Sequence, residues 1–145
     1  MIRHYSDKGE VVPELQHAKS FRDLIVHQKA RKIAQTIFQL SKPFPKDETY
    51  SLTDQIRRAS RAIGAQIAEA WGKRPYERHF VSKLTDADAE QLETQHWVDV
   101  AFDCGYLTQP QHAVLLDSLS EIGRMLHSMI AKASQFCGPP CSTDD

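Results

Sequence analysis

The sequence predicts an all-α protein that folds as an antiparallel up-down-up-down four-helix bundle. Apolar residues recur at steps of three and four in four long segments, which is the period of an amphipathic helix. Glycines and prolines interrupt this pattern mainly between the segments, and no segment has the alternation typical of a β-strand. With 145 residues, the chain has the length of one domain with a sizeable core.

The first predicted helix begins at a capping box formed by Ser20 and Asp23, and it runs to about Ser41. Two prolines in the segment 42–50 prevent a continuous helix there and predict a loop. The residues expected along the buried line of the first helix are Val26, Ala30, Ile33, Ile37 and Leu40.

The second predicted helix begins at Ser51, which with Asp54 can cap it, and ends at Gly72. Alanines and Gly64 keep this helix thin, so that neighbouring helices can approach it closely. The residues expected on its buried face are Leu52, Ile56, Ala59, Ile63, Ile67 and Ala70.

The third predicted helix begins near Pro75 and closes at Gly105. Its middle is polar on most faces, which is unusual for a bundle helix. The fourth begins at a second capping box, Thr108 with Gln111, and ends before the prolines of Cys137–Cys141. The expected buried residues are Phe80, Leu84, Ala87, Val98, Ala101 and Phe102 in the third helix, and Leu115, Leu119, Ile122, Leu126, Met129 and Ala133 in the fourth.

The helices form one predicted domain, residues 20–136, between two segments without helical periodicity. We expect residues 1–19 to be a flexible arm and residues 137–145 to be a disordered tail. The N-terminal segment lacks the apolar core of a signal peptide, and no run of about 18 apolar residues is present to span a membrane. Three cysteines form no disulfide framework. These features predict a cytoplasmic protein without a membrane partner.

Charge is segregated along a chain whose net charge is only −1. Residues 22–74 carry a net charge of +6, and residues 75–145 carry −7. Such asymmetry arises from pairing between helices, or from a basic surface for an anionic partner such as nucleic acid. The candidate nucleic-acid-binding residues are Arg57, Arg58, Arg61, Lys73 and Arg74, together with Lys29, Arg31 and Lys32 of the first helix.

Two interpretations of this basic set stay open. Arginines contact phosphates in a bidentate way, which gives salt-dependent and sequence-tolerant binding to RNA or DNA. Alternatively, the arginines pair with carboxylates of the third helix, inside one subunit or between subunits. Aromatic residues are nearly absent around the arginines in the sequence, so sequence-specific readout is not expected. The carboxylates concerned are Asp86, Asp88, Glu90 and Glu93.

The polar middle of the third helix also allows a metal-site hypothesis. Glu93 and His96 have the E-x-x-H spacing of di-iron bundles. The only other pair with this spacing, Glu14 and His17, lies before the first helix, which disfavours a metal-binding enzyme. The extra carboxylates of such a site would come from the second and fourth helices, from Glu69 and Glu121.

A buried polar network is a further hypothesis for this region. Buried polar groups need partners, and networks of such groups often specify register or oligomeric state. At a subunit interface, the same residues would orient the assembly instead of performing chemistry. The candidates for the network or the oligomer interface are Glu69, Asp88, Gln91, Glu93, Gln95 and Trp97.

No residue pattern indicates an enzyme. The sequence has neither a Ser-His-Asp nor a Cys-His arrangement, and it has no glycine-rich phosphate loop. Cys137 and Cys141 have no matching Cys or His pair at zinc spacing. The sequence therefore predicts a protein without catalytic residues, a metal or a cofactor.

The second helix resembles that of a family of four-helix-bundle proteins encoded in intervening sequences of 23S ribosomal RNA genes. The resemblance rests on QIRRASRAIGAQIAEAWGKR in this helix, FRDLIVHQKARKIA in the first, and FPKDETYSLTDQI across the loop. Two further matching pieces are CGYL at 104–107 and EIGRMLHSMIAK in the fourth helix, so that the match covers about 21–136. Accessory variability proteins of diversity-generating retroelements are more distantly similar.

The resemblance implies a ring-like homo-oligomer, a pentamer, with nucleic-acid binding through a basic surface. The chain departs from the family pattern at Gln66 and Ala70, where Asn and Gly are usual, and at His27, where Trp is common. The third helix carries DADAEQLETQHW in place of a run of small residues. The prediction is a non-enzymatic homo-oligomer that binds RNA or DNA non-specifically, with a structural scaffold as the alternative.

Overall fold

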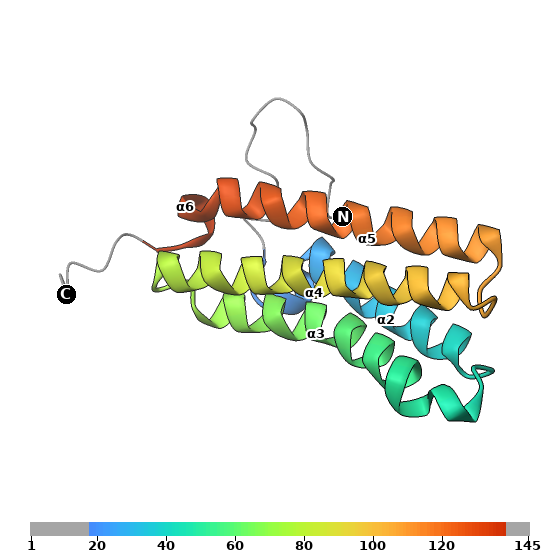
Figure 1. The fold of residues 1–145 in the computed structure, drawn as a ribbon. Coiled ribbons are helices and arrows are strands. Elements are labelled where there is room, and N and C mark those ends of the chain that lie inside the picture. Colours follow the sequence, from blue (N-terminus) through green and yellow to red (C-terminus); the bar gives the residue numbers. More distant parts are fainter. Residues whose placement is uncertain (1–17, 139–145) are drawn as a thin grey trace.

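The computed structural model describes residues 18–138, and within them the chain is α-helical apart from turns and connections, without a β-strand. A short helix, α6 (Ala133–Phe136), follows the last long one. Four long helices lie lengthwise beside one another (Figure 1): α2 (Ile25–Ser41), α3 (Asp54–Gly72), α4 (Glu77–Asp103) and α5 (Gln109–Ala131).

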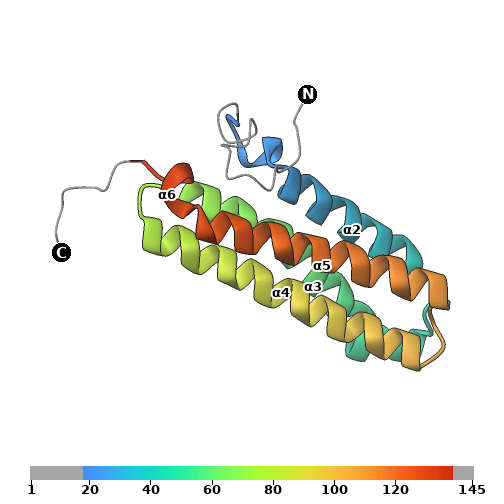
Figure 2. The same cartoon turned by 90° about the horizontal axis from the view of Figure 1, so that it is seen from above.

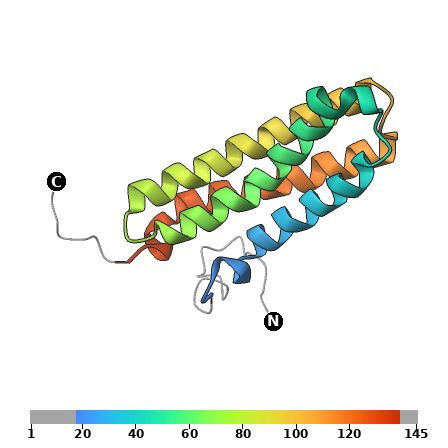
Figure 3. The same cartoon turned by 90° about the horizontal axis from the view of Figure 1, so that it is seen from below.

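The chain reverses direction at each connection between the long helices (Figure 1). α3 packs against both α2 and α4, and α5 packs against both α4 and α2. Seen from above, α5 lies between α4 and α2 (Figure 2). Seen from below, α2 and α3 lie side by side and are joined at one end (Figure 3).

Apolar side chains from all four long helices form one core. The face predicted for the second helix is confirmed, since each of its six residues is at most 1% exposed. All residues predicted for the fourth helix are buried as well. Leu40 and Phe102 are the exceptions in the other two helices, because each lies in the last turn of its helix and is only half-buried.

The predicted capping box at Ser20 and Asp23 is present, but it caps a separate short turn and not the first long helix. Oδ2 of Asp23 accepts a hydrogen bond from the Ser20 amide at 3.1 Å, and the box starts the 3₁₀ turn η1 (Phe21–Asp23). Leu24 is extended and separates this turn from α2. The first long helix therefore begins at Ile25, four residues later than the box alone predicts.

The predicted turn between the third and fourth helices is confirmed. The Tyr106 amide donates to the Ala101 carbonyl at 2.9 Å, and Gly105 has a φ of +80°, which together form a Schellman motif. The capping box follows, since the Thr108 amide donates to Oε1 of Gln111 at 2.9 Å.

The predicted cap at Ser51 is wrong. The turns η2 (Lys46–Glu48) and η3 (Thr49–Thr53) are already helical and lead directly into α3. The Asp54 amide donates to the Thr49 carbonyl, so this end of α3 needs no side-chain cap. Ser51 donates instead to Oε1 of Glu48 at 3.1 Å.

The predicted arm, 1–19, lies outside the described residues except for its last two positions. Of the predicted tail, 137–145, only Cys137 and Gly138 are described, and the Cys137 amide donates to the Ala133 carbonyl at 3.0 Å. None of the described helices is long and apolar enough to cross a membrane.

Candidate functional site

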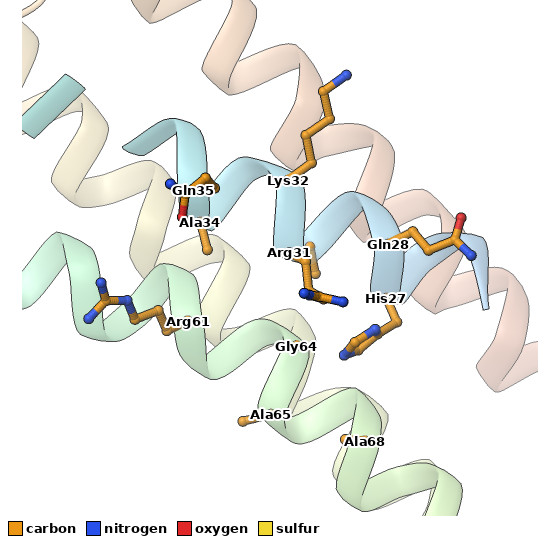
Figure 4. A pocket seen from close by; sticks show the side chains of 11 residues that line it. His27, Gln28, Arg31, Lys32, Ala34, Gln35, Arg61, Gly64, Ala65 and Ala68 are labelled. Carbon is orange, nitrogen blue, oxygen red and sulfur yellow. The ribbon is translucent and has the colours of Figure 1, made fainter. Parts of the chain in front are cut away.

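An open groove of about 740 Å³ runs between α2 and α3 (Figure 4), and we call it the basic groove. Gly64, Ala65 and Ala68 line it from α3, and their small side chains leave the hollow unfilled. As far as residues 18–138 are concerned, no carboxylate lines it. The polar and charged residues that do are His27, Gln28, Arg31, Lys32, Gln35 and Arg61.

Two arginines reach the groove from opposite sides. Arg31 points from α2 toward α3, whereas the neighbouring Lys32 points away from α3 (Figure 4). Arg61 comes from α3, and its guanidinium carbon lies 5.5 Å from the centre of the Phe38 ring. The same ring lies 4.8 Å from the guanidinium carbon of Arg57. An aromatic side chain therefore lies beside the arginines, because Phe38 of α2 packs against the guanidinium groups of α3.

The arginines of α3 keep their charge unpaired within the described part of the molecule. Nε of Arg57 donates to Oγ of the buried Ser41 at 2.8 Å, and Arg58 is exposed. Neither they nor Arg61 form an ion pair with any acidic residue between positions 18 and 138. The hypothesis of pairing with the third helix inside one subunit is therefore not supported, and pairing between subunits stays a prediction.

Lys73 and Arg74 belong to a different place. They follow α3 at its C-terminal end and do not line the groove. The Arg74 guanidinium carbon lies 3.5 Å from the centre of the Trp71 ring, and its Nε donates to the Trp71 carbonyl at 2.9 Å. The structure therefore divides the predicted basic set into a group near the groove and a pair at the helix end.

His27 is a groove residue that the sequence did not reveal as a site. It is only 6% exposed, and its Nδ1 has no hydrogen-bond partner among the described residues. Its ring packs edge-on against Phe21, with 4.8 Å between the ring centres. Burial, and then the charges of Arg31 and Arg22, lower the pKa of His27. The available signal was a histidine next to the predicted buried line of the first helix.

A polar network joins α4 to α5. Nε2 of Gln95 donates to Oε1 of Gln91 at 2.7 Å, and Nε2 of Gln91 donates to Oδ1 of Asp88 at 2.9 Å. Nε2 of His127, on α5, lies 2.9 Å from Oδ2 of Asp88. Gln91 is only 3% exposed, so the two bonds to its amide satisfy groups that water does not reach freely. We call this contact the α4–α5 seam.

Gly123 makes room for the seam on α5. A Cβ atom at this position would lie 2.8 Å from Nε2 of Gln91 and 3.4 Å from Oδ1 of Asp88. A side chain here would displace the amide that links the network. Sequence reasoning grouped Asp88, Gln91 and Gln95, but it missed His127 and Gly123, because both come from another helix.

The other predicted members of this group do not join the network. Glu69 forms an ion pair with Lys83 at 3.3 Å, and its side chain is 55% exposed. Glu93 is exposed. Trp97 is half-buried, and its indole Nε1 is buried without a hydrogen-bond partner in the described part of the chain. These three residues remain candidates for contact with another subunit.

The geometry does not support the metal-site hypothesis. No three His, Cys, Asp or Glu side chains gather as metal ligands anywhere in residues 18–138. Glu93 and His96 are both exposed, and Glu121 pairs with Lys29 at 3.1 Å. The other E-x-x-H pair, at positions 14 and 17, lies outside the described residues.

α4 carries the opposite charge to the groove. Asp86, Glu90 and Glu93 follow one another at steps of four and three, so they share one face of this helix. Burial, and then the charges of Glu93 and Asp86, raise the pKa of Glu90. The acidic face of α4, defined by these three residues, is thus a region of mutual repulsion, and a cationic partner would relieve it.

Comparison with protein-family models identifies the family. The model of the 23S rRNA-intervening sequence protein matches residues 22–128. A crystal structure from Bacteroides thetaiotaomicron VPI-5482, of an S23 ribosomal protein family member of unknown function, is similar at a TM-score of 0.67 and 29% identity. That similarity covers 74% of this chain and 96% of the other. A search among curated proteins finds no match. The chain belongs to the 23S rRNA-intervening sequence protein family.

Proposed function

We propose that this protein is a non-enzymatic up-down-up-down four-helix bundle that self-associates and binds RNA or DNA through the basic groove. The observation that carries the proposal is the charge of the groove. Its lining contains Arg31, Lys32 and Arg61 and, over the described residues, no acidic side chain. Phosphates that bind there release counterions, so affinity depends on salt more than on base sequence.

The arginines of α3 extend this surface along the helix. Arg57 and Arg61 lie one turn apart, a spacing at which like charges repel by about 0.2–0.5 kcal/mol. A bound anion would relieve that repulsion. The Phe38 ring beneath both guanidinium groups restricts their motion, which lowers the entropy lost when they bind phosphate.

Self-association is part of the same proposal, with a pentameric ring as the proposed assembly. Leu92 on α4 and Val114 on α5 are 55% and 62% exposed, which is high for large apolar side chains. Contact between copies would cover such residues. The family resemblance is the second support for this part of the proposal.

Fluorescence anisotropy of a labelled single-stranded oligonucleotide, measured across a salt series, tests nucleic-acid binding. We expect the logarithm of the affinity to fall linearly with the logarithm of salt concentration. The double variant Arg31→Ala/Arg61→Ala should bind at least roughly tenfold more weakly. It should also reduce the slope of log affinity against log salt concentration by the amount expected for the loss of about two phosphate contacts.

The matched control is Arg78→Ala/Arg124→Ala. It removes the same charge from exposed positions on α4 and α5 that do not line the groove. Tight binding that is indifferent to salt, or that responds equally to both double variants, would contradict the proposed groove.

A scaffold without nucleic-acid affinity is the second candidate, favoured by the acidic face of α4. In an assembly, that face of one copy would bind the basic groove of the next, because their charges are complementary. Light scattering with and without nucleic acid separates the two candidates. The scaffold candidate predicts an oligomer that does not bind nucleic acid at physiological salt. It also predicts that the double variant Arg31→Ala/Arg61→Ala dissociates this oligomer.

A further inference from the structure

The basic groove contains one polar side chain that phosphate binding by arginines alone does not explain. The His27 ring lies between α2 and α3 (Figure 4). A Cβ atom at Gly64 would lie 3.7 Å from Nε2 of this ring, so the glycine leaves that edge uncovered at position 64. Nδ1 is buried and has no partner among residues 18–138. A ligand in the groove therefore meets the imidazole at Nε2.

We propose that His27 makes phosphate binding in this groove depend on protons. A backbone phosphodiester binds beside Arg31 and accepts a hydrogen bond from Nε2 of His27, while Arg61 adds positive charge farther along the groove (Figure 4). The ring takes up a proton from solvent as the phosphate arrives, so binding tightens as the pH falls. This inference rests on the proposed function and adds regulation by pH to the same site.

The charges that face His27 in the free protein are positive. Arg22 of η1 and Arg31 of α2 act on its ring, and Arg61 of α3 lines the same groove. They disfavour the imidazolium and, together with burial, hold the pKa of His27 low. A bound phosphate offsets these positive charges and raises that pKa. Linkage then requires that the protonated protein bind phosphate more tightly by the same factor.

Three carboxylates on the elements beside α2 are engaged elsewhere. Asp23 of η1 accepts hydrogen bonds from the Lys19 and Ser20 amides, at 2.8 and 3.1 Å. Glu69 of α3 pairs with Lys83, and Glu121 of α5 pairs with Lys29. No carboxylate of the described segments lines the groove, so within those segments no negative charge offsets the arginines near His27.

The first test is the affinity for a labelled oligothymidylate at constant ionic strength, from about pH 5 to about pH 8, the range in which histidine titrates. The probe itself has no group that titrates in this range. With the full chain, we expect affinity to rise toward acid, by up to about tenfold per pH unit between the free and bound pKa values of His27. His27→Gln should lose this slope, and His79→Gln, which changes an exposed histidine of α4, should keep it.

The second test does not depend on the folding of a variant. The imidazole resonances of His27 in the unchanged protein are titrated by NMR with and without the oligothymidylate. We expect its pKa to rise when the oligonucleotide binds. An oligothymidylate with uncharged methylphosphonate linkages should leave the pKa where it is, because it presents the same bases without the phosphate charge.

Affinity that depends on salt and on Arg31 and Arg61 but not on pH overturns the proton linkage and leaves the proposed function standing. A pH slope that persists in His27→Gln overturns it too, as does a His27 pKa that the oligonucleotide does not move. If the mass of the assembly changes with pH through His27 and nucleic acid does not bind, the occupant of the groove is a second copy of the chain. That result overturns both proposals. Absence of binding at every pH also overturns both.

Discussion

The basic groove and the α4–α5 seam each place a polar side chain opposite a glycine, yet one contact is open and the other is closed. In the groove, His27 faces Gly64, and one ring nitrogen is buried without a partner among the described residues. In the seam, Gln91 faces Gly123, and both its amide nitrogen and its amide oxygen are hydrogen-bonded within α4. In the seam the Gln91 amide is hydrogen-bonded on both sides, whereas in the groove the proposed ligand contact is at the other ring nitrogen of His27, Nε2.

The two glycines also differ in what they do. A Cβ at position 64 would be at an ordinary contact distance of 3.7 Å from the His27 ring. A Cβ at position 123 would lie 2.8 Å from the Gln91 amide nitrogen, so the hydrogen-bonded Gln91 side chain would have to shift. The seam therefore needs its glycine for packing, and the groove does not. This contrast separates a structural polar network from a candidate binding site.

Removing the acceptor at the centre of the seam should have the largest effect. Asp88→Ala leaves the buried Gln91 amide nitrogen without its partner, which costs about 1–3 kcal/mol of unfolding free energy. Urea denaturation measures the loss. The control is Glu93→Ala, an exposed position on the same helix, which should change stability by less than about 0.5 kcal/mol. Equal losses in the two variants would show that the seam contributes nothing of its own.

The glycines themselves should respond in opposite directions. Alanine favours a helix over glycine by about 0.5–1 kcal/mol, and Gly64→Ala should retain much of that gain because its Cβ has room. Gly123→Ala should lose about 1 kcal/mol or more, because the new methyl displaces the Gln91 amide. Thermal unfolding followed by circular dichroism gives both midpoints. Midpoints that shift the same way would remove the distinction between the two contacts.

The groove should show itself in the pH dependence of stability. The folded state lowers the pKa of His27, so the unfolded chain takes up a proton first. Unfolding free energy should therefore fall as the pH drops from the ordinary histidine pKa of about 6.5 toward the lowered value, and it should level off below it. Comparing denaturation of the protein and of His27→Gln at each pH isolates this contribution. A stability difference that stays constant across the range would contradict it.

Substitution of Glu69 should have the smallest effect on the stability of a single subunit. Its ion pair with Lys83 is exposed, so Glu69→Gln should change the unfolding free energy by less than about 0.5 kcal/mol. If Glu69 lies at an interface between copies, as proposed, light scattering should show a smaller assembly nonetheless. Unchanged mass at matched concentration would exclude it from the interface.

Helical periodicity was enough to predict the buried faces. The six apolar positions predicted between Leu52 and Ala70 are all buried, because apolar side chains repeated at three and four residues must share one side of a helix. Local chemistry was enough for Gly105 and Thr108, since a Schellman motif and a capping box involve only neighbouring residues. The Ser51 cap failed because a π-helical turn takes over that role, which no residue spacing indicated.

The sequence by itself determined the helices, their buried faces, the segregation of charge and the resemblance to the family. Only the tertiary structure decided that Phe38 lies against Arg57 and Arg61, that His127 reaches Asp88, and that His27 faces a groove without carboxylates. The physical reason is that periodicity describes one helix at a time. A groove or a network depends on the rotation and offset of two helices, which packing across the whole core sets.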